Sequence, residues 1–554
     1  MSRSRRLGQR SWVAAVAAFA LLCAGCERCS REEAALAPAP APAPPRPPAV
    51  LAEFVVPEPA LAYRALRPLF GAPAALLPSG PEIALSLALG LDATAAGSFD
   101  LSRPFAGTVA LPDSGGAEVV AAVPLALGSE FVARLSTGPS ASHRVQPRPP
   151  LLLLIPRADK QPSLAVIDDA LLIGSRAGLE RSGSYLARGL LRKPVSGAPR
   201  AELLPQTLAP AARRYWKERR SQLSALAEQS QQRHGRPADF AEPAAVLASA
   251  DLVVETLLTR LEAARSAEIV LAPGTDQLTI SARLRSSDAV TGAPPALGPE
   301  LLSALPAQTL AAFASVRGER PRSAPAASGF LRALLGARLE GEGSRAFENA
   351  LEALDAVDSA RGERQVIACL RGWSLVWAGD VADRAAMASA FDRLFSALAR
   401  TTRAGATTGP LGSVRLTKER AVLPESKSPA ERYRFRFQQV GSKVSSVSEL
   451  EVLVWIEGDQ FVVTLGRDAD PALALVRAAR AGTAALGSSR AFGPALTRLL
   501  PSAGWVLLAD AGLLTGAAPA AVLASAASTD EFSELRVELS SAALEGLARW
   551  GLSP

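Results

Sequence analysis

The sequence predicts a mixed α+β protein in which a unit of antiparallel strands with packed helices occurs twice, together with an inserted helical hairpin. Three observations carry this prediction. Short runs rich in leucine or β-branched residues alternate with Gly, Pro and Asp, which is typical of strands and turns. The order hairpin, helix, strands, hairpin and helix appears in two regions. Between these regions lies a long stretch with helical periodicity.

Residues 1–25 have the pattern of an export signal. Arg3, Arg5, Arg6 and Arg10 make the start basic, and an apolar run follows over residues 11–22. That run is shorter than the roughly 20 residues that a membrane-spanning helix needs, and a site of small residues comes after it. The arginine pair also hints at twin-arginine export, but a glycine stands where that signal has an apolar residue. Export in the unfolded state is therefore favoured.

The cleavage site Leu22-Cys23-Ala24-Gly25-Cys26 resembles the lipobox of bacterial lipoproteins. Ala24 and Gly25 fit that pattern, whereas Cys23 stands where leucine is usual. The resemblance implies that a signal peptidase cuts before Cys26 after its thiol has received a diacylglyceryl group. We therefore expect a lipid anchor in the inner or outer membrane, with the chain facing the periplasm or the cell surface.

Residues 26–50 are predicted to be a tether. Cys26 and Cys29 have the spacing of a redox pair, but such a pair needs a helix N-terminus that stabilises a thiolate, and a proline-rich tail follows here. Alternating proline favours extended polyproline II because it fixes φ and removes backbone donors. At about 3.1 Å per residue, the proline-rich stretch at residues 33–49 reaches roughly 50 Å. A disordered tether differs from this stalk only in stiffness.

The first α+β unit is predicted over residues 51–200. Strands are expected at 105–111, 118–125, 151–155, 164–167 and 170–173, with helices at 129–135 and 176–188. Asp168 and Asp169 provide the turn of the last hairpin. This hairpin and the segment Asp100-Leu101-Ser102-Arg103-Pro104 resemble parts of bacterial secreted proteins with domains of unknown function. Because no activity and no functional residues are known for those domains, the resemblance assigns none to this chain.

Residues 201–290 are predicted to form a helical hairpin followed by a β-hairpin. The first helix covers 208–234 and ends at Gly235, with Pro237 beyond, which is a usual stop signal. Asp239 and Glu242 have the spacing of a capping box for the second helix. The inward stripe of that helix is expected to hold Leu247, Ala250, Val254, Leu257 and Leu261. Strands at 268–271 and 277–285 follow.

The second unit is predicted over residues 291–490, after a linker at 286–300. Strands are expected at 365–370, 373–378, 414–422, 433–437, 450–456 and 460–465, and Asp380 is the expected N-cap of a helix. Another helix covers 471–481. Gly174 and Gly466 end corresponding hairpins in the two units. Residues 491–554 are expected to add strands at 505–509 and 534–539 and a final helix.

The composition and the net charge limit the kinds of partner that we expect. The chain has 554 residues, of which 48% are hydrophobic and 20% charged, which is typical of globular proteins and enough for two to four domains after the tether. The formal net charge is +7, and the four leader arginines account for four of these charges, so about +3 remains after cleavage. DNA-binding domains carry a dense basic stripe, and we therefore expect no nucleic-acid partner.

Catalytic motifs are missing from the sequence. His143 is expected in a loop, and His234 at a helix end, where a charged imidazole favours the helix dipole. Cys369, in an apolar strand, is expected to be a buried structural thiol. The sequence contains no HExxH, GxSxG, SxxK or GxxxxGK motif, and turn chemistry accounts for Asp168 and Asp169. We therefore predict no enzymatic activity, no metal and no cofactor.

One basic aromatic segment is a candidate surface site, and it consists of Arg213, Arg214, Trp216, Lys217 and Arg220. On a helix, Arg213, Lys217 and Arg220 share a face. Such a face attracts anionic lipid headgroups or an acidic envelope protein. The alternative is an ordinary solvated helix face.

We expect a membrane-anchored envelope lipoprotein that acts as a non-enzymatic binding or scaffold protein. Two alternatives stay open: a periplasmic carrier of an apolar ligand, and an enzyme of unrecognised type. A deep apolar cavity favours the carrier. A cleft with converging polar groups and shifted pKa values favours the enzyme. A filled core with a flat exposed patch favours the scaffold.

Overall fold

The computed structural model describes residues 44–552 except 113–115, 138–140, 158–162, 235–242, 287–295, 318–340, 373, 407–410, 424–428, 440–446, 513–519 and 529–531. The leader, Cys26, Cys29, most of the tether, and the expected capping box at Asp239 and Glu242 lie outside the described residues. The predicted mixed α+β class is confirmed, because helices make up 40% and strands 38% of the described part of the chain.

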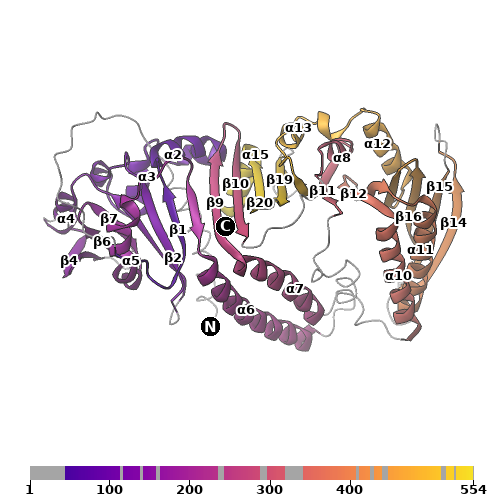
Figure 1. The fold of residues 1–554 in the computed structure, drawn as a ribbon, viewed down its shortest axis with the longest axis horizontal. Helices are drawn as coiled ribbons and strands as arrows, with labels where there is room; N and C mark the ends of the chain where they lie inside the picture. Colours follow the sequence, from indigo (N-terminus) through magenta and orange to yellow (C-terminus); the bar gives the residue numbers. More distant parts are fainter. Residues whose placement is uncertain are drawn as a thin grey trace.

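The described strands form one sheet of 20 antiparallel strands (Figure 1). The first ten are β1 (Val50–Val56), β2 (Phe105–Ala110), β3 (Glu118–Pro124), β4 (His143–Arg148), β5 (Leu151–Pro156), β6 (Ser163–Ile167), β7 (Ala170–Gly174), β8 (Arg200–Leu203), β9 (Ala264–Pro273) and β10 (Gln277–Ser286). The others are β11 (Thr309–Val316), β12 (Arg361–Leu370), β13 (Leu375–Val381), β14 (Leu411–Ala421), β15 (Ala430–Gln439), β16 (Val447–Glu457), β17 (Gln460–Gly466), β18 (Ala503–Asp510), β19 (Ala521–Ser528) and β20 (Phe532–Ser540).

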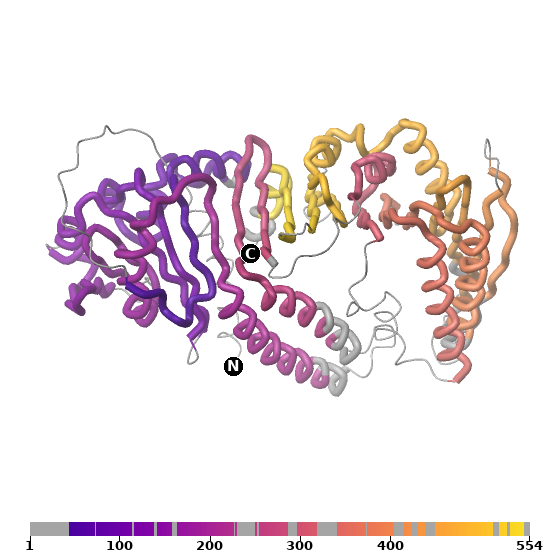
Figure 2. Tube along the Cα trace, in the orientation of Figure 1, coloured from indigo at the N-terminus to yellow at the C-terminus, as the bar shows by residue number. Residues whose placement is uncertain are grey.

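The two halves of the sheet have corresponding strand orders. From one edge to the centre, the order is β4-β5-β6-β7-β3-β2-β1-β8-β9-β10. From the other edge it is β14-β15-β16-β17-β13-β12-β11-β18-β19-β20. We call β1–β10 the first half and β11–β20 the second half. They join where β10 pairs with β20, which brings magenta and yellow segments together in Figure 2.

The hairpins β6–β7 and β16–β17 show why local sequence produces the same element twice. Each has a two-residue turn whose first residue has positive φ, at Asp168 (51°) and at Gly458 (60°). Aspartate and glycine tolerate this left-handed conformation, which tight antiparallel turns require. As predicted, Gly174 ends β7 and Gly466 ends β17.

Helices cover both faces of the first half. The helices α2 (Pro59–Leu66), α3 (Pro81–Ala88) and α4 (Gly128–Ser136) contribute Leu66, Leu85 and Phe131 to one buried core. On the opposite face, α5 (Arg176–Arg188) buries Leu179 and Leu186. The Ser175 hydroxyl accepts a hydrogen bond from the Gly178 amide, 3.1 Å away, and so caps α5 at its start.

In the second half, α10 (Gly341–Ala360) and α11 (Arg384–Ala406) pack together over β13 and β15–β17. Met387 and Phe391 of α11 are fully buried in this contact. On the opposite face lie α8 (Glu300–Ser303), α12 (Asp470–Arg480) and α13 (Gly493–Leu496). The final helix, α15 (Ser541–Leu552), follows β20.

The expected N-cap at Asp380 is wrong. Strand β13 continues to Val381, and Asp380 forms an ion pair with Arg364, whose Nε lies 2.9 Å from its Oδ2. Asp383 caps α11 instead, because its Oδ1 accepts a hydrogen bond from the Ala386 amide at 3.0 Å. Both aspartates suit a cap by composition, and only the length of β13 decides between them.

Two long helices, α6 (Pro205–His234) and α7 (Pro243–Glu262), connect β8 to β9. They lie side by side below the sheet in Figure 1 and run antiparallel, since Arg213 reaches Glu262 while Arg220 reaches Asp251. The corresponding connection between β18 and β19 spans only residues 511–520. The long connection is therefore a feature of the first half alone.

Candidate functional site

A continuous uncharged face runs across the middle of the sheet. Paired strands place three rows of residues side by side on it, across β13, β12, β11, β18, β19, β20, β10 and β9. The rows are Leu375-Cys369-Ala311-Ala509-Val522-Leu539-Leu278-Pro273, Trp377-Ile367-Phe313-Leu507-Ala524-Val537-Ile280-Leu271, and Gly379-Gln365-Ser315-Trp505-Ala526-Leu535-Ala282-Ile269. None of these residues is charged. We call the part on β13, β12, β11, β18, β19 and β20 the open face; at one end of it, Val522 and Leu539 pack against buried residues that include Ala543 and Leu544 of α15.

Large apolar side chains on the open face are accessible to solvent. The exposed fractions are 45% for Ile367, 44% for Leu507, 43% for Leu375, 41% for Phe313 and 37% for Leu535. Ile367 and Leu507 are the direct cross-strand neighbours of Phe313. These exposed side chains therefore form a contiguous patch and are not scattered singly over the surface, as most exposed apolar residues are.

Aromatic residues mark the extent of the patch. Trp377 packs edge-on against Phe391 of α11 and Phe461 of β17, with ring centroids 5.7 and 5.4 Å away, so helical cover ends at β13. Phe313 and Trp505, 6.3 Å apart, lie beyond that cover. Aromatic side chains of this kind dominate the energetics of protein interfaces because they bury a large area with few rotatable bonds.

The other side of the same strands is fully covered. Ala314, Val366 and Leu508 alternate with the open-face residues and are at most 1% exposed. They pack under α12 and α13, which contribute Leu473, Val476 and Leu496. Strands that are apolar on both faces are typical of sheets buried on both sides. In β11, β12 and β18, only one side has helical cover from the described residues.

The predicted basic segment lies on α6, where α7 neutralises part of it. Arg213 bonds to both Glu255 and Glu262, and the Arg220 Nε lies 2.6 Å from Asp251. The Glu262 hydrogen bond, with that of Glu255 second, raises the pKa of Arg213.

The remaining residues of this segment differ in their surroundings. Trp216 is half-buried and donates its indole N–H to Asp251, 2.8 Å away. Arg214 and Lys217 are exposed. The structure thus brings Arg213, Trp216 and Arg220 together against α7 and leaves Lys217 facing solvent.

The expected inward stripe of α7 is wrong at Leu257, which is 60% exposed. Its neighbour Leu258 is buried instead, at 5%. Leu247, Val254 and Leu261 are half-buried. A helix that packs mainly against one other helix buries a narrow stripe, so a shift of one residue decides which leucine points inward.

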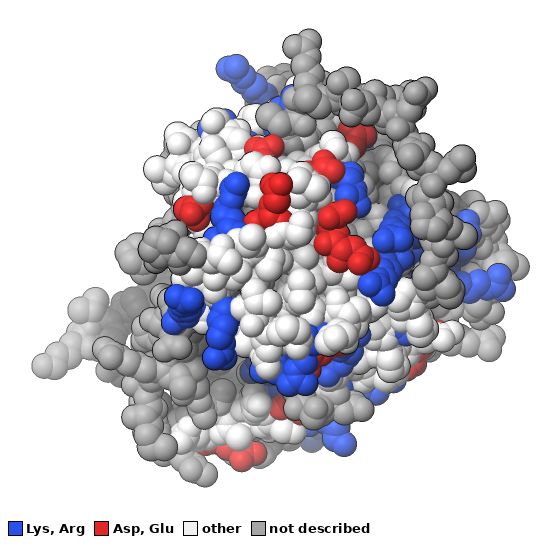
Figure 3. All heavy atoms as spheres, turned by 90° about the vertical axis from the view of Figure 1, so that its left-hand side faces the viewer, with Lys and Arg blue, Asp and Glu red and all other residues white. Residues whose placement is uncertain are grey.

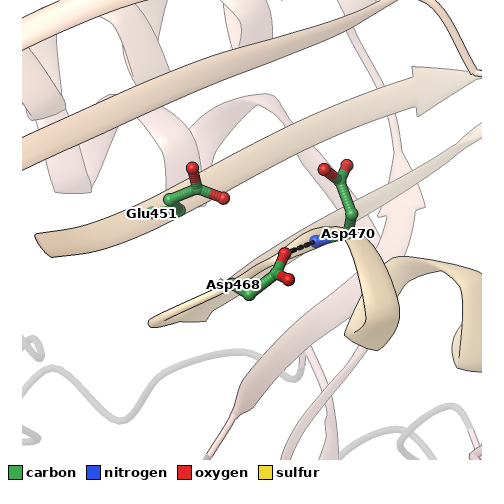
Figure 4. A group of neighbouring side chains, drawn as sticks. All are labelled: Glu451, Asp468 and Asp470. Carbon is green, nitrogen blue, oxygen red and sulfur yellow. Dashed lines mark hydrogen bonds between the residues drawn. The ribbon is translucent and has the colours of Figure 1, made fainter.

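Three carboxylates meet beside β16, as Figure 4 shows: Glu451, Asp468 and Asp470 have oxygens within 4.8 Å of one another. Arginines are paired with two of these three carboxylates. The Arg434 Nε is 2.6 Å from Glu451, and an Arg432 Nη is 2.6 Å from Asp470.

Burial acts to raise the pKa of Glu451, but hydrogen bonds from Arg434 and from the Ala469 amide outweigh it and hold that pKa below its ordinary value. The group is therefore an ion-pair network. It gives no support for a metal site, because a cation would have to displace both guanidinium groups.

Two chemically reactive residues lie elsewhere than expected. His143 begins β4 and is 1% exposed, whereas the sequence indicated a loop. Its Nδ1 is 2.8 Å from the Ser142 hydroxyl, its Nε2 has no partner among the described residues, and burial lowers its pKa. Cys369 was expected to be a buried thiol but is half-buried on the open face.

Sequence reasoning missed the open face, although a signal for it exists. The runs Val366-Ile367-Ala368-Cys369-Leu370 and Trp505-Val506-Leu507-Leu508-Ala509 are apolar without alternation, which predicts cover on both faces. Strand β11, which lies between them, was not expected. Without β11 the two runs cannot be recognised as parts of one surface.

Neither the surface charge nor the comparison with known proteins points to a further site. In Figure 3, which faces the end of the molecule formed by the first half, acidic and basic side chains are intermixed and do not separate by sign. Among the described residues, no helix combines the length and apolarity needed to span a membrane. No family model, curated protein or solved structure matches this chain.

Proposed function

We propose that the protein is an envelope lipoprotein that binds another protein through the open face, while a lipid on Cys26 holds it at the membrane. The single observation that carries the binding proposal is the uncharged patch around Phe313, Ile367 and Leu507, each exposed by 41–45%. A partner that covers such a patch removes apolar surface from water, and this favours binding. The anchor rests on the leader and on Ala24-Gly25-Cys26.

A protein partner accounts for this surface better than an enclosed apolar ligand. Carriers surround their ligands in cavities lined mainly by apolar side chains. The open face belongs to a sheet and carries exposed aromatic residues, as protein interfaces do. A cavity of about 440 Å³ at the end of β11 is lined by Arg371, Arg490 and Asp510 rather than by the open-face residues.

Two other functions have weaker support. Contact with an anionic surface through Arg213, Arg214, Trp216, Lys217 and Arg220 is disfavoured, because Glu255, Glu262 and Asp251 neutralise Arg213 and Arg220. An enzyme needs a catalytic group that is available to the substrate, but the clustered carboxylates of Glu451 and Asp470 are paired with arginines. A paired carboxylate is held in its charged form and is a poor proton acceptor.

We also infer that the chain contains a duplicated α+β unit, with α6 and α7 as a helical hairpin inserted into the first copy. The corresponding strand orders of the two halves support this, as do the matching turns at Asp168 and Gly458. Duplication followed by pairing of β10 with β20 explains how one sheet reaches 20 strands. A hairpin on such a scaffold is free to vary without disturbing the sheet.

The anchor is tested by changing Cys26→Ala in the full chain. The variant has no thiol for the diacylglyceryl group, so we expect it to remain unprocessed or to leave the lipid phase. Cys29→Ser is the matched control and should be processed like the parent. Intact-mass spectrometry decides the question, and a parent protein whose mature N-terminus lies elsewhere and carries no acyl mass would contradict the anchor.

The open face is tested with a dye that fluoresces in contact with apolar surface. Phe313→Ser combined with Leu507→Ser should weaken dye binding, because both side chains are exposed and adjacent. Leu61→Ser is the control, since Leu61 is 57% exposed but lies on α2 in the first half. Unchanged dye binding by the double variant would show that the patch is not available to partners.

A further inference from the structure

We infer that the cavity at the ends of β11 and β18 is a binding site for a phosphate-type oxyanion, held between Arg371 and Arg490. The cavity has a volume of about 440 Å³ and is lined by Arg371, Arg490, Asp510, Thr309, Ser489 and Phe492, with Ala307 and Ala491. It adjoins a smaller cavity of about 170 Å³, and Arg490 lines both.

The aspartate in this cavity is committed to holding the loop after β18. The Asp510 side chain is 4% exposed, and its Oδ1 accepts hydrogen bonds from the Gly512 and Ala520 amides at 2.9 and 2.8 Å. Its Oδ2 lies 3.9 Å from the nearest Arg371 nitrogen, the outer limit of an ion pair. Arg371 itself is 60% exposed. Asp510 thus lies beside Arg371 at the cavity without saturating the donors of Arg371.

The second arginine is available for a ligand. Arg490 is exposed and forms no hydrogen bond or ion pair with the residues that the structure describes. In contrast, Arg498, which lines the adjoining cavity, has its Nε 2.9 Å from Glu538. An exposed guanidinium at a cavity wall, without a partner among the described residues, has its donors available for an external anion.

The loop that carries Arg490 is well fixed. Phe492 is 2% exposed and packs into the core under α12 and α13. The Ser489 amide donates to the Leu486 carbonyl, and the Ser489 carbonyl accepts from the Gly493 amide at 2.8 Å. Arg490 therefore projects from a backbone held on both sides, so a ligand has only the Arg490 side chain to order.

The donor set defines the ligand class. Two guanidinium groups and one aspartate leave an excess of one positive charge, and each guanidinium donates in a fork that matches two oxygens of a phosphate or carboxylate. The volume exceeds that of a lone phosphate and admits an attached organic group. The ligand that we propose is a phosphate ester, either a soluble phosphomonoester or the phosphodiester headgroup of an anionic lipid.

Calorimetric titration of the detergent-solubilised mature protein at low salt tests this site. The probes are inorganic phosphate, glycerol 3-phosphate and glycerophosphoglycerol, a water-soluble phosphodiester headgroup. Binding of the monoester with no binding of the diester supports a soluble ligand, and binding of the diester supports a lipid headgroup. If none of the three probes binds, the proposal is wrong.

Variants assign any binding to the cavity. Arg490→Gln and Arg371→Gln should each weaken binding by about tenfold or more, as expected when a charge-assisted hydrogen bond is lost. Arg490→Lys should bind with intermediate affinity, since it keeps the charge and loses the fork. Arg144→Gln is the control, because Arg144 is exposed on β4, far along the sheet. Equal affinities for the parent, Arg490→Gln and Arg371→Gln would overturn the site.

Discussion

At the scale of single residues, most of the groups that usually perform chemistry are paired with each other. Arg213 and Arg220 bind the carboxylates of α7, and Arg432 and Arg434 bind those near Glu451. Ion pairs of this kind hold elements together and leave few charges for a substrate. Among the described residues, the exposed apolar side chains around Phe313 stay available for contact with another molecule.

His143 makes the stability of the first half depend on pH. Burial lowers its pKa below the ordinary 6.5, so the unfolded chain binds more protons than the folded chain in the window below pH 6.5. The free energy of unfolding should therefore be highest above pH 6.5 and fall as the pH decreases toward the folded-state pKa. The slope contributed by one histidine is at most about 1.4 kcal/mol per pH unit.

Urea unfolding of the parent and of His143→Asn, measured between about pH 7.5 and 5.5, isolates this contribution. The difference between the two unfolding free energies should shrink or reverse as the pH falls, because only the parent must keep a buried imidazole uncharged. A constant difference across this range would show that His143 does not titrate differently in the folded and unfolded chains.

At the scale of helices and strands, the sequence predicts well where local signals suffice. Helix α5 runs over residues 176–188 as expected, because Ser175 caps it and Leu179 and Leu186 repeat at helical spacing. The predicted helix over residues 208–234 likewise lies within α6. The hairpins that end at Gly174 and Gly466 follow from their turn residues.

Elements without such signals were not predicted. Strand β11 is rich in alanine, and β8 has only four residues, so neither has a marked periodicity. Each is a strand because it lies between two others: β11 between β12 and β18, and β8 between β1 and β9. That placement depends on residues far apart in the chain, which local propensity does not report.

The contact between α6 and α7 depends on Asp251, which binds both Trp216 and Arg220. Asp251→Asn should loosen this pair and increase amide hydrogen exchange in both helices several-fold. The melting temperature should change little, because partly exposed ion pairs contribute less than about 1 kcal/mol.

Lys217→Gln is the control for this experiment, since Lys217 is exposed on the same helix. Its exchange pattern should match that of the parent. Equal exchange in Asp251→Asn and Lys217→Gln would mean that Asp251 does not hold the helices together.

At the scale of the whole molecule, the pairing of β10 with β20 joins the two halves of the sheet into a single surface. The β10–β20 register places Arg283 beside Glu534, residues 251 positions apart that also form an ion pair. No local pattern predicts that contact. For the open face, the apolar runs of β12 and β18 were a partial signal, since an apolar strand shows that a side chain avoids water but not what covers it.

The central claim is that a protein partner binds the open face, and photo-crosslinking in intact cells tests it most directly. A photoreactive phenylalanine analogue replaces Phe313, and the matched control carries it at Leu61, which is also exposed but lies on α2. We predict a discrete crosslinked protein from position 313 and none from position 61. Crosslinks from 313 only to lipid or within the same chain, or the same products from both positions, would contradict the claim.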